Sequence, residues 1–335
     1  MVTGDPLLSA EQLKLCQSVA FSASVLELPV YLVGGVVRDM LLGGSLEGKD
    51  LDFVIEGDAI KLARVCAQAL EGELREFPDF MTAKIISPKA CPGVCGIDFA
   101  SSRKELYPKP GSLPLVEPAG IREDLRRRDF SINAIALPLG DFLKWQAEGK
   151  GELRVLENYA LDLFKGVEDM KNRLIRILHE RSFLDDPTRI FRACRYAARL
   201  SAVIEPQTKE LLQAALGAEA LNTVSYFRKF TELRKICSER SWFKAIQSLG
   251  QFGVFEKMGL CCPGHSEKVL TKLAALAAKQ PELCEEDLFA LLLKIFYYDW
   301  PERERGPRFR SFGFGKKFMN KMKLLNSRFE HGKGR

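Results

Sequence analysis

The stretch VYLVGGVVRDMLLGGSLEGKDLDFVIEG, residues 30–57, decides how the chain begins to fold. Its first part is a short apolar β-type run that ends in two glycines, "VVRDMLL" restarts as a helix, and "DLDFVIEG" is again strand-like. The pattern predicts a strand, a helix and a second strand joined by glycine-containing turns. Two double glycines and two closely spaced aspartates also raise the question of whether the stretch holds a phosphate and metal ions.

The two aspartates, Asp50 and Asp52, are two residues apart. On a strand that spacing puts both carboxylates on one face, where they repel each other unless a cation lies between them. Mg²⁺ prefers such oxygen ligands. A third carboxylate, Asp98 in "GIDFASS", belongs to another predicted strand that could lie beside the first. A lone pair of this kind is more often a solvated strand face, so the pair alone does not decide between the two interpretations.

The glycines make the metal and phosphate interpretation stronger. Gly34 and Gly35 lie between the strand and the helix, where small residues let the backbone approach a ligand and helix amides favour anions. No GxxxxGK[ST] or GxGxxG sequence occurs, which excludes a P-loop and a dinucleotide fingerprint. We expect Gly43 and Gly44 only to end the helix.

The composition is that of an ordinary globular protein. The 335 residues exceed what one compact core usually holds, and 46% are hydrophobic and 28% charged. We find no signal segment, and the most apolar run, residues 288–300, contains Lys294 and is too short to cross a bilayer, so we expect no membrane partner. Nine cysteines without a signal segment predict free thiols in a cytoplasmic protein. The spacing of Cys91, Cys95, Cys261 and Cys262 is not that of a zinc finger or ribbon.

The charge is unevenly distributed. Residues 301–335 hold 11 Lys and Arg against 3 Asp and Glu, so this end carries +8 of a total formal charge of +6. A basic end on a nearly neutral body favours a polyanionic partner such as nucleic acid, although a solvated end would have the same composition.

The order of expected elements defines the fold class. Strands and helices alternate over about the first 155 residues, and residues 103–122, with four prolines, predict an ordered but mobile loop. From about residue 160 every segment has a helical pattern. We therefore expect an α/β head followed by an all-helical second half. The expected helices are 166–178, 186–200, 208–216, 225–238, 241–249, 266–279 and 285–297.

Five ordered stretches resemble the motifs of one family. The glycine and aspartate stretch is similar to the first motif of the bacterial-type (class II) tRNA nucleotidyltransferase and poly(A) polymerase family, which has the DNA polymerase β-like fold. The later motifs are similar to residues 127–137, 161–178, 183–200 and 225–236. The resemblance implies a catalytic head over residues 1–155, a helical neck with base recognition over 156–260, and an RNA-binding body with a short basic tail over 261–335.

The resemblance implies roles for the residues of the first two motifs. Asp50 and Asp52 would be catalytic and bind Mg²⁺, with Asp98 as a third ligand. The incoming triphosphate would be contacted by Gly34, Gly35 and Arg38. In "RRRDFSINA" we expect polar groups at the start of an apolar helix. Asp129 and a neighbouring arginine, Arg127 or Arg128, would recognise the ribose hydroxyls, while Asn133 would assist at the phosphates.

The fourth motif, "FLDDPTRIFRACRYAARL", implies base recognition. We expect Asp186 to cap a helix whose first turn contains Pro187. By resemblance, Asp186 and Arg189 take the positions of an acid and an arginine that together mimic a Watson–Crick edge, since a carboxylate accepts and a guanidinium donates. Asp185 replaces the glutamate that is usual there, and we expect it to support the pair. Three further arginines follow the pattern of a solvated helix face, and the first of them stays a candidate nucleotide contact: Arg192, Arg195 and Arg199.

Two further sets of charged residues complete the prediction. Arg228 and Glu232 are four residues apart, which favours a helix-stabilising ion pair. The candidate RNA contacts of the basic end are Arg308, Arg310, Lys316, Lys317, Lys321 and Lys323.

The implied function is the addition of C, A or both to the tRNA 3′ end from CTP and ATP, without a nucleic-acid template and with release of pyrophosphate. Enzymes that add only A or only CC, and poly(A) polymerases, are the alternatives within the family. The resemblance implies that residues 103–122 match the family's flexible loop, which is needed to add the terminal A, and its full length argues against a CC-only enzyme. An RNA-binding module without catalysis is the alternative from another class, and the presence of every expected acidic residue argues against it.

Overall fold

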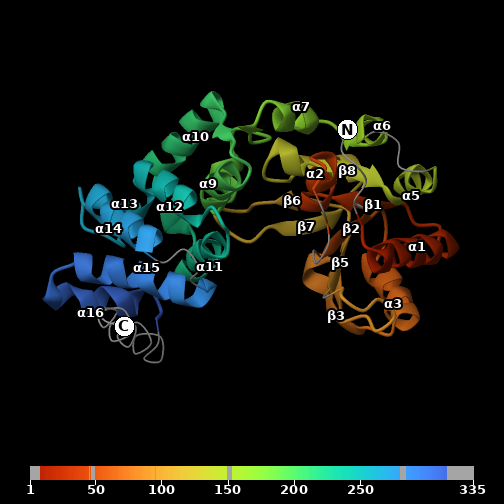
Figure 1. Cartoon of the computed structure of the whole chain (residues 1–335), viewed down its shortest axis with the longest axis horizontal. Helices are drawn as coiled ribbons and strands as arrows, with labels where there is room; N and C mark the ends of the chain where they lie inside the picture. The colour runs from red at the N-terminus through yellow and green to blue at the C-terminus, as the bar shows by residue number, and fades with distance from the viewer. Residues whose placement is uncertain are drawn as a thin grey trace. The chain divides into compact units, whose positions relative to one another are not determined.

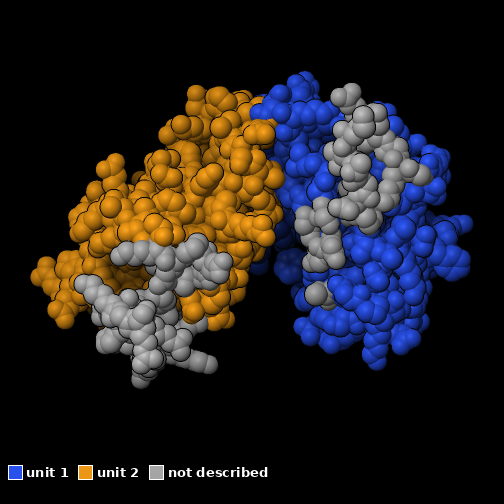
Figure 2. All heavy atoms as spheres, in the orientation of Figure 1, with its two compact units in different colours: residues 1–108, 113–172, 176–178 blue, residues 109–112, 173–175, 179–335 orange. Residues whose placement is uncertain are grey.

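The computed structural model describes residues 8–44, 46, 50–94, 96–148, 153–279 and 284–314. The chain forms two compact units, coloured separately in Figure 2. Unit 1 comprises residues 1–108, 113–172 and 176–178, and unit 2 comprises residues 109–112, 173–175 and 179–335. The division into a head, a neck and a body stays a prediction.

Unit 1 is built on a mixed sheet of seven strands (Figure 1). Only β2 and β5 pair in parallel, and the other pairings within this sheet are antiparallel. From one edge to the other the strands are β3 (Glu73–Phe77), β4 (Thr82–Ile86), β5 (Gly96–Ser101), β2 (Leu51–Ile55), β1 (Val30–Val33), β8 (Ile135–Pro138) and β9 (Leu161–Asp162). The predicted α/β character of the first part of the chain is thereby confirmed.

Helix α3 (Ala59–Leu70) packs against β4 and β5 and shows why this segment is helical. The Asp58 carboxylate accepts a hydrogen bond from the amide of Lys61, which caps the first turn. The buried residues recur every three or four positions and form one apolar face. They are Ala59, Leu62, Ala63, Cys66, Ala67 and Leu70. Helix α1 (Ala10–Val25), which begins with a capping box at Ser9, packs against α3 and α5 (Leu139–Ala147).

The opposite face of the sheet is partly covered by α4 (Ile121–Arg126). Ile121 and Leu125 of this helix pack with Val54 of β2 and Ala136 of β8. Because side chains alternate along a strand, Val54 shares its face with Asp52. Helix α4 therefore ends on the face of the sheet that carries the aspartates. Three short helices complete unit 1: α2 (Gly35–Leu41), α6 (Leu153–Glu157) and α7 (Gly166–Lys171).

Residues 103–122 form more regular structure than the sequence predicted. β6 (Arg103–Leu106) and β7 (Leu115–Pro118) pair in an antiparallel hairpin, and α4 starts at Ile121. The prolines lie in or beside the turn and at the end of β7, where no ladder hydrogen bond is lost. The expected irregular loop is limited to the hairpin turn.

Unit 2 is mainly helical, as expected. Its helices are α8 (Ser182–Asp185), α9 (Arg189–Arg199), α10 (Pro206–Gly217), α11 (Tyr226–Cys237), α12 (Trp242–Gln251), α13 (Val254–Lys257), α14 (Ser266–Lys279), α15 (Glu285–Asp299) and α16 (Glu302–Ser311). A small parallel sheet, β10 (Leu174–Ile175) with β11 (Val203–Ile204), is an exception to the all-helical prediction. The expected helix 166–178 was wrong beyond Lys171, because Arg173 adopts a left-handed φ of 54° that ends the helix before β10.

None of the described helices is both long and apolar enough to cross a membrane. Eight of the nine cysteines lie in the described part of the chain, and each of them is a free thiol.

Candidate active site

The three predicted carboxylates meet on adjacent strands of unit 1. Asp52 of β2 lies directly beside Asp98 in the parallel register of β2 with β5, and Asp50 immediately precedes β2. Lys84 of β4 lies opposite Asp98 in the next register. The Lys84 Nζ atom is 2.9 Å from Asp98 Oδ2 and 3.1 Å from Asp50 Oδ2. The sheet thus gathers three acids around one ammonium group.

The charges in this cluster do not balance. Desolvation, followed by repulsion from Asp98, raises the pKa of Asp52 to about 6, against attraction from Arg128 and Lys84. Because the Asp52 side chain is exposed, desolvation contributes less to this raised pKa, and repulsion from the neighbouring carboxylates is its better supported cause. Burial opposes the charge of Lys84, but its hydrogen bonds to Asp98 and Asp50 outweigh burial and raise its pKa. The site therefore holds more negative than positive charge, which is the condition that suits a bound cation.

Arg127 and Arg128 are held by one buried acid, Asp124 of α4. Arg127 Nη2 is 2.7 Å from Asp124 Oδ1, and Arg128 Nη2 is 2.9 Å from Asp124 Oδ2. Burial disfavours the ionised form of Asp124, but the charges and hydrogen bonds of the two arginines outweigh it and lower the pKa of Asp124. Gly34 has a φ of 68°, and a Cβ there would lie 3.2 Å from Arg128 Nη1. Arg128 is thus fixed against the first glycine turn.

The prediction of a helix starting at "RRRDFSINA" was wrong. Arg127 is the C-cap of α4, residues Ser131–Asn133 form a single 3₁₀ turn, and β8 follows at Ile135. The polar residues therefore end one helix and lead into a strand. The apolar run that suggested a helix is the buried strand itself, since short apolar runs do not distinguish the two.

Arg38, Asn133 and Asp129 form a buried chain of hydrogen bonds. Arg38 donates from Nη1 to Asn133 Oδ1 at 2.7 Å and from Nε to Asp39 Oδ1 at 2.9 Å. Asn133 in turn donates to Asp129 Oδ1 at 3.2 Å. Arg38 is only 1% exposed, so its bond to Asn133, and the bond from Asn133 to Asp129, orient both side chains from within the core. The expected contact of Arg38 with the triphosphate stays a prediction. The double glycine at the other end of α2 ends the helix as expected, with Gly43 at a φ of 73°.

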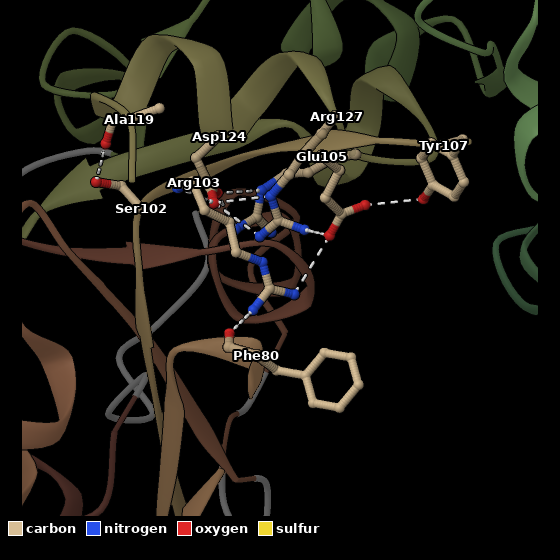
Figure 3. A network of polar contacts seen from close by, with 9 residues as sticks. Phe80, Ser102, Arg103, Glu105, Tyr107, Ala119, Asp124 and Arg127 are labelled. Carbon is tan, nitrogen blue, oxygen red and sulfur yellow. Dashed lines mark hydrogen bonds and ion pairs between the residues drawn. The ribbon is translucent and has the colours of Figure 1, made fainter. Parts of the chain in front are cut away.

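Glu105, at the base of the hairpin of β6 and β7, connects the hairpin to Arg127 (Figure 3). Glu105 accepts hydrogen bonds from Arg127 at 2.7 Å, from Arg103 at 3.2 Å and from the Tyr107 hydroxyl at 2.8 Å. Arg103 also donates to the carbonyl of Phe80. Residues 103–107, the start of the segment that was predicted as a loop, therefore form a hydrogen-bond network that connects the hairpin to α4.

A cavity of about 340 Å³ in unit 1 lies away from this chemistry. Gly57, Ser101 and Pro118 are among its lining residues, which places it at the ends of β2 and β5. The aspartates lie towards the beginnings of the same two strands, so the cavity is not the carboxylate site.

In unit 2, Asp186 is held by residues from two helices. Its Oδ1 accepts hydrogen bonds from the Thr188 amide at 3.1 Å, the Thr188 hydroxyl at 2.7 Å and Arg228 Nη2 at 2.9 Å. The prediction that Asp186 caps α9 was wrong, because α9 begins at Arg189 with Thr188 as its N-cap and Asp186 is the C-cap of α8. The Asp186 carboxylate instead holds that N-cap residue through its amide and hydroxyl. No described residue donates a hydrogen bond to Asp186 Oδ2, so this oxygen can accept one from a ligand.

The other predicted base-recognition residues lie close along the same segment. Arg189 is buried and donates to the Ser182 hydroxyl at 2.6 Å. Burial, and then the charge of Arg189, lower the pKa of His179, so this imidazole is neutral near pH 7. Asp185 lies 3.5 Å from Arg181, and Arg192 is half-buried on α9. Their roles in nucleotide binding stay predictions.

The expected solvated arginine face holds for the exposed Arg199 but was wrong for Arg195, and the expected pair of Arg228 with Glu232 was also wrong. Glu232 pairs with Lys235 at 2.8 Å and with Arg195 at 3.8 Å, so the Arg195 side chain is only 11% exposed. Arg228 instead donates to Asp186 and, from Nη1 at 2.7 Å, to the carbonyl of Gly111. Neither Arg228 nor Lys84 was among the predicted site residues. For Arg228, the sequence offered only its four-residue spacing from Glu232, which indicated a pair within the helix.

A polar cluster around Asp299 lies in the last third of the chain. Asp299 accepts hydrogen bonds from the Cys262 amide at 2.8 Å and from His265 at 2.9 Å, and Lys268 lies 3.6 Å away. The Cys262, His265 and Asp299 ligand atoms are close enough for a metal. The Asp299 carboxylate is, however, already balanced by these donors, and the cluster ties the turn after residue 261 to the end of α15.

The predicted RNA contacts lie only partly within the described residues. Arg310 of α16 is exposed, whereas Arg308 pairs with Glu304 at 3.1 Å and stacks 3.5 Å from the centre of the Trp300 ring. Lys316, Lys317, Lys321 and Lys323 lie outside the described residues.

Comparison with known proteins identifies the family of the chain. Residues 30–176 match the family described as the poly A polymerase head domain. A crystal structure of a tRNA nucleotidyltransferase, complexed with a primer tRNA and an incoming ATP analogue, is similar with a TM-score of 0.70 and 31% identity. The similarity covers 94% of this chain and 87% of that one. The chain belongs to the class II tRNA nucleotidyltransferase and poly(A) polymerase family.

Relatives within this family differ in what they add. The chain is 38% identical over 253 residues to an A-adding tRNA nucleotidyltransferase of Aquifex aeolicus, and 35% identical over 233 residues to a CC-adding one of Deinococcus radiodurans. These matches cover 74% and 70% of this chain. They span only 28% and 55% of the two relatives, so the chain corresponds to part of their length.

Proposed function

We propose that the chain transfers nucleotides from ATP or CTP to the 3′ end of tRNA and releases pyrophosphate. The observation that carries the proposal is the cluster of Asp50, Asp52 and Asp98 on adjacent strands, with one lysine against three acids. Membership of the family supports the substrate class, since one member was solved with a primer tRNA and an ATP analogue.

The cluster fits divalent metal ions, which nucleotidyltransferases of this fold generally use. Its donors are all carboxylate oxygens, which Mg²⁺ prefers, and the ammonium of Lys84 already bridges two of them. We therefore assign Asp50, Asp52 and Asp98 as the residues that would hold Mg²⁺. When bound, such ions would neutralise phosphate charge and lower the pKa of the attacking 3′-hydroxyl.

The protein's own groups would orient the nucleotide. Gly34 and Gly35 form the turn into α2 beside Arg128, which suits a triphosphate because neither residue carries a Cβ. Asp129 and Asn133, held from below by Arg38, would accept and donate hydrogen bonds at the ribose and phosphates. A ribose contact would select ribonucleotides.

Base choice would depend on Asp186 and Arg189. Asp186 Oδ1 is occupied by Thr188 and Arg228, which orients the carboxylate and leaves Oδ2 as an acceptor for a base amino group. Cytosine N4 and adenine N6 are both amino donors, so such a pair could accept C and A and reject uracil, whose equivalent position is a carbonyl.

Among the possible products we favour A addition. The A-adding relative is 38% identical to the chain and the CC-adding one 35% identical. The hairpin of β6 and β7 supports the same choice, because the family resemblance implies that this segment is needed for A addition. The RNA that is extended, and the nucleotide added to it, would distinguish a CC-adding, CCA-adding or poly(A)-synthesising activity.

The test is an extension assay with the purified chain, Mg²⁺ and one labelled nucleotide at a time. The substrates are tRNA lacking its CCA end, tRNA ending in CC, and oligo(A). We expect ATP to be added to tRNA ending in CC. Addition of CTP to the shortened tRNA would indicate a CC- or CCA-adding enzyme, and extension of oligo(A) a poly(A) polymerase. If no substrate is extended while tRNA is still bound, the chain is an RNA-binding module and the proposal fails.

A further inference from the structure

Lys84 occupies a position in the carboxylate cluster that the assigned function does not explain. Its register partner on β5 is Asp98, whose own register partner on β2 is Asp52. The Lys84 side chain therefore rises from the same face of the sheet as both acids. Its ammonium makes two ion pairs, at 2.9 Å to Asp98 and 3.1 Å to Asp50, with only 33% of the side chain exposed.

The ammonium and a metal ion would compete for the same oxygens. Asp50 Oδ2 and Asp98 Oδ2 hold the Lys84 ammonium at 3.1 and 2.9 Å, so a Mg²⁺ ion held by the same two carboxylates would compete with it for these oxygens. Two cations cannot occupy this position together, because they would overlap and repel each other. Loading the site with such an ion requires the Lys84 ammonium to leave.

Gly96 of β5 provides the space in which Lys84 lies. A Cβ built on Gly96 would be 2.7 Å from Lys84 Cε and 3.2 Å from Lys84 Nζ. The Gly96 backbone is not left-handed, so alanine suits its conformation, and the three atoms nearest to its Cβ would be the far end of the flexible Lys84 side chain and the Ile85 carbonyl at 3.5 Å. Alanine at this position would push the ammonium away from the acids without changing any charge.

We propose that Lys84 is a resident counter-cation of the carboxylate cluster, which a divalent ion must displace and which thereby sets the metal affinity of the site. The inference rests on the proposed function, since it takes Asp50, Asp52 and Asp98 as metal ligands. In the metal-free protein Lys84 holds Asp50 and Asp98 together against their mutual repulsion. When a metal ion is bound, the Lys84 ammonium must lie away from the acids. The free energy needed to displace it weakens metal binding.

The test is the affinity for Mn²⁺ without nucleotide, measured by calorimetry or by the electron paramagnetic resonance of free Mn²⁺. The Lys84→Met variant removes the competing charge, and we expect it to bind Mn²⁺ about fivefold more tightly than the wild type. Gly96→Ala should change the affinity in the same direction, because it displaces the ammonium while all charges remain. Lys104→Met is the matched control, since Lys104 makes an exposed pair with Glu117 on the hairpin at 2.8 Å.

A second readout follows the metal-free state. Without Mn²⁺, Lys84→Met should melt at a lower temperature than the wild type, since three acids are left without their counter-ion. Mn²⁺ should raise its melting temperature more than it raises that of the wild type, because tighter binding to the folded state stabilises more. This readout does not depend on nucleotide transfer.

The outcomes separate this inference from the proposed function. If the wild type binds Mn²⁺ and Lys84→Met binds it equally or more weakly, the counter-cation role is refuted while the metal assignment stands. If Lys104→Met tightens binding as much as Lys84→Met, the effect is one of net charge and the role is again refuted. If neither the wild type nor Lys84→Met binds Mn²⁺, the inference and the metal assignment fall together. A wild type that binds Mn²⁺ but extends no RNA would refute only the proposed function.

Discussion

Each unit contains an acidic group held by a basic one, but the two sites balance their charges differently. In unit 1, Lys84 serves Asp50 and Asp98 while Asp52 keeps a raised pKa of about 6. In unit 2, Asp186 has its own partner in Arg228 and two hydrogen bonds from Thr188. The first site is short of positive charge, and the second is balanced.

The difference indicates what each site can bind. A site with excess negative charge in one place binds cations, and holding phosphates there requires those cations. A balanced acid whose second oxygen remains available can accept a hydrogen bond from an uncharged base edge without a large electrostatic penalty. The predictions below test this contrast, starting from the largest expected effect.

Removing an acid from the first site should abolish the chemistry whatever the base. We expect Asp52→Ala to lower kcat by about a thousandfold or more with either ATP or CTP, since several kcal/mol of charge stabilisation are lost. Its melting temperature should not fall, because a repelled carboxylate has been removed. Single-turnover extension and a thermal melt measure the two quantities. A variant that retained full nucleotide addition would refute the metal assignment.

Asp124 should matter for stability rather than for charge balance at the metal. Asp124→Asn leaves Arg127 and Arg128 without their shared buried acid, and we expect a loss of about 3 kcal/mol in the free energy of unfolding. The exposed pair of Asp141 and Lys144 is the control, and Asp141→Asn should change stability by less than about 0.5 kcal/mol. Denaturant melts of both variants test this, and equal effects would contradict the assignment.

The pH dependence of that loss has a definite sign. The pKa of Asp124 is lowered in the folded state, so its contribution to stability is complete above its unfolded pKa of about 4. The contribution disappears as the pH falls through the lowered folded-state pKa. The difference in stability between the wild type and Asp124→Asn should therefore be constant at neutral pH and shrink below about pH 4. A difference that grew on acidification would contradict this account.

Changes in the second site should alter base choice more than rate. Asp186→Asn keeps the shape but replaces one acceptor oxygen by a donor, and we expect the preference for ATP over UTP to fall about tenfold. Arg228→Met should have a smaller effect in the same direction, because the carboxylate would keep its hydrogen bonds to Thr188 but lose its ion pair. The ratio of kcat/KM values measures both. Arg199→Gln, at an exposed pair with Glu239, is the control and should leave the ratio unchanged.

The smallest effects are expected at the basic end. Arg310 is exposed whereas Arg308 is engaged by Glu304 and Trp300. If this end contacts RNA phosphates, Arg310→Gln should reduce the slope of log affinity against log salt by about 0.7 to 0.9, and Arg308→Gln should reduce it less. Filter binding of tRNA at several salt concentrations measures the slopes. Unchanged slopes in both variants would remove α16 from the RNA contacts.

The sequence predicted those parts of the fold in which local pattern and tertiary environment agree. β1, β2 and β5 were recognisable because their apolar residues follow the period of the element that they form. β3 was missed, because its sequence ELREF is half-exposed and charged, as suits an edge strand. The hairpin of β6 and β7 was hidden by its prolines, and the turn at Arg173 depends on a left-handed residue that the sequence does not mark.

The site residues divide in the same way. Asp50 and Asp52 could be found from their spacing, since both lie at the beginning of one strand. Lys84 is 34 residues from Asp50, and Arg228 is 42 residues from Asp186, so their ion pairs depend on sheet register and helix packing. Nothing in a single sequence specifies those registers, which is why both residues were assigned no role in the site beforehand.

The sharing of Asp124 by two arginines has a consequence for how the family can change. Each arginine uses a different oxygen of the same carboxylate, and Arg127 also binds Glu105 of the hairpin. A substitution at Arg127 would leave Asp124 Oδ1 without its guanidinium partner, although the Arg103 amide would still donate to it, and would allow Arg128, which lies against Gly34, to adopt a different geometry. Positions 105, 124, 127 and 128 are therefore expected to show epistasis, so that in an alignment of relatives they would covary as a group rather than drift one by one.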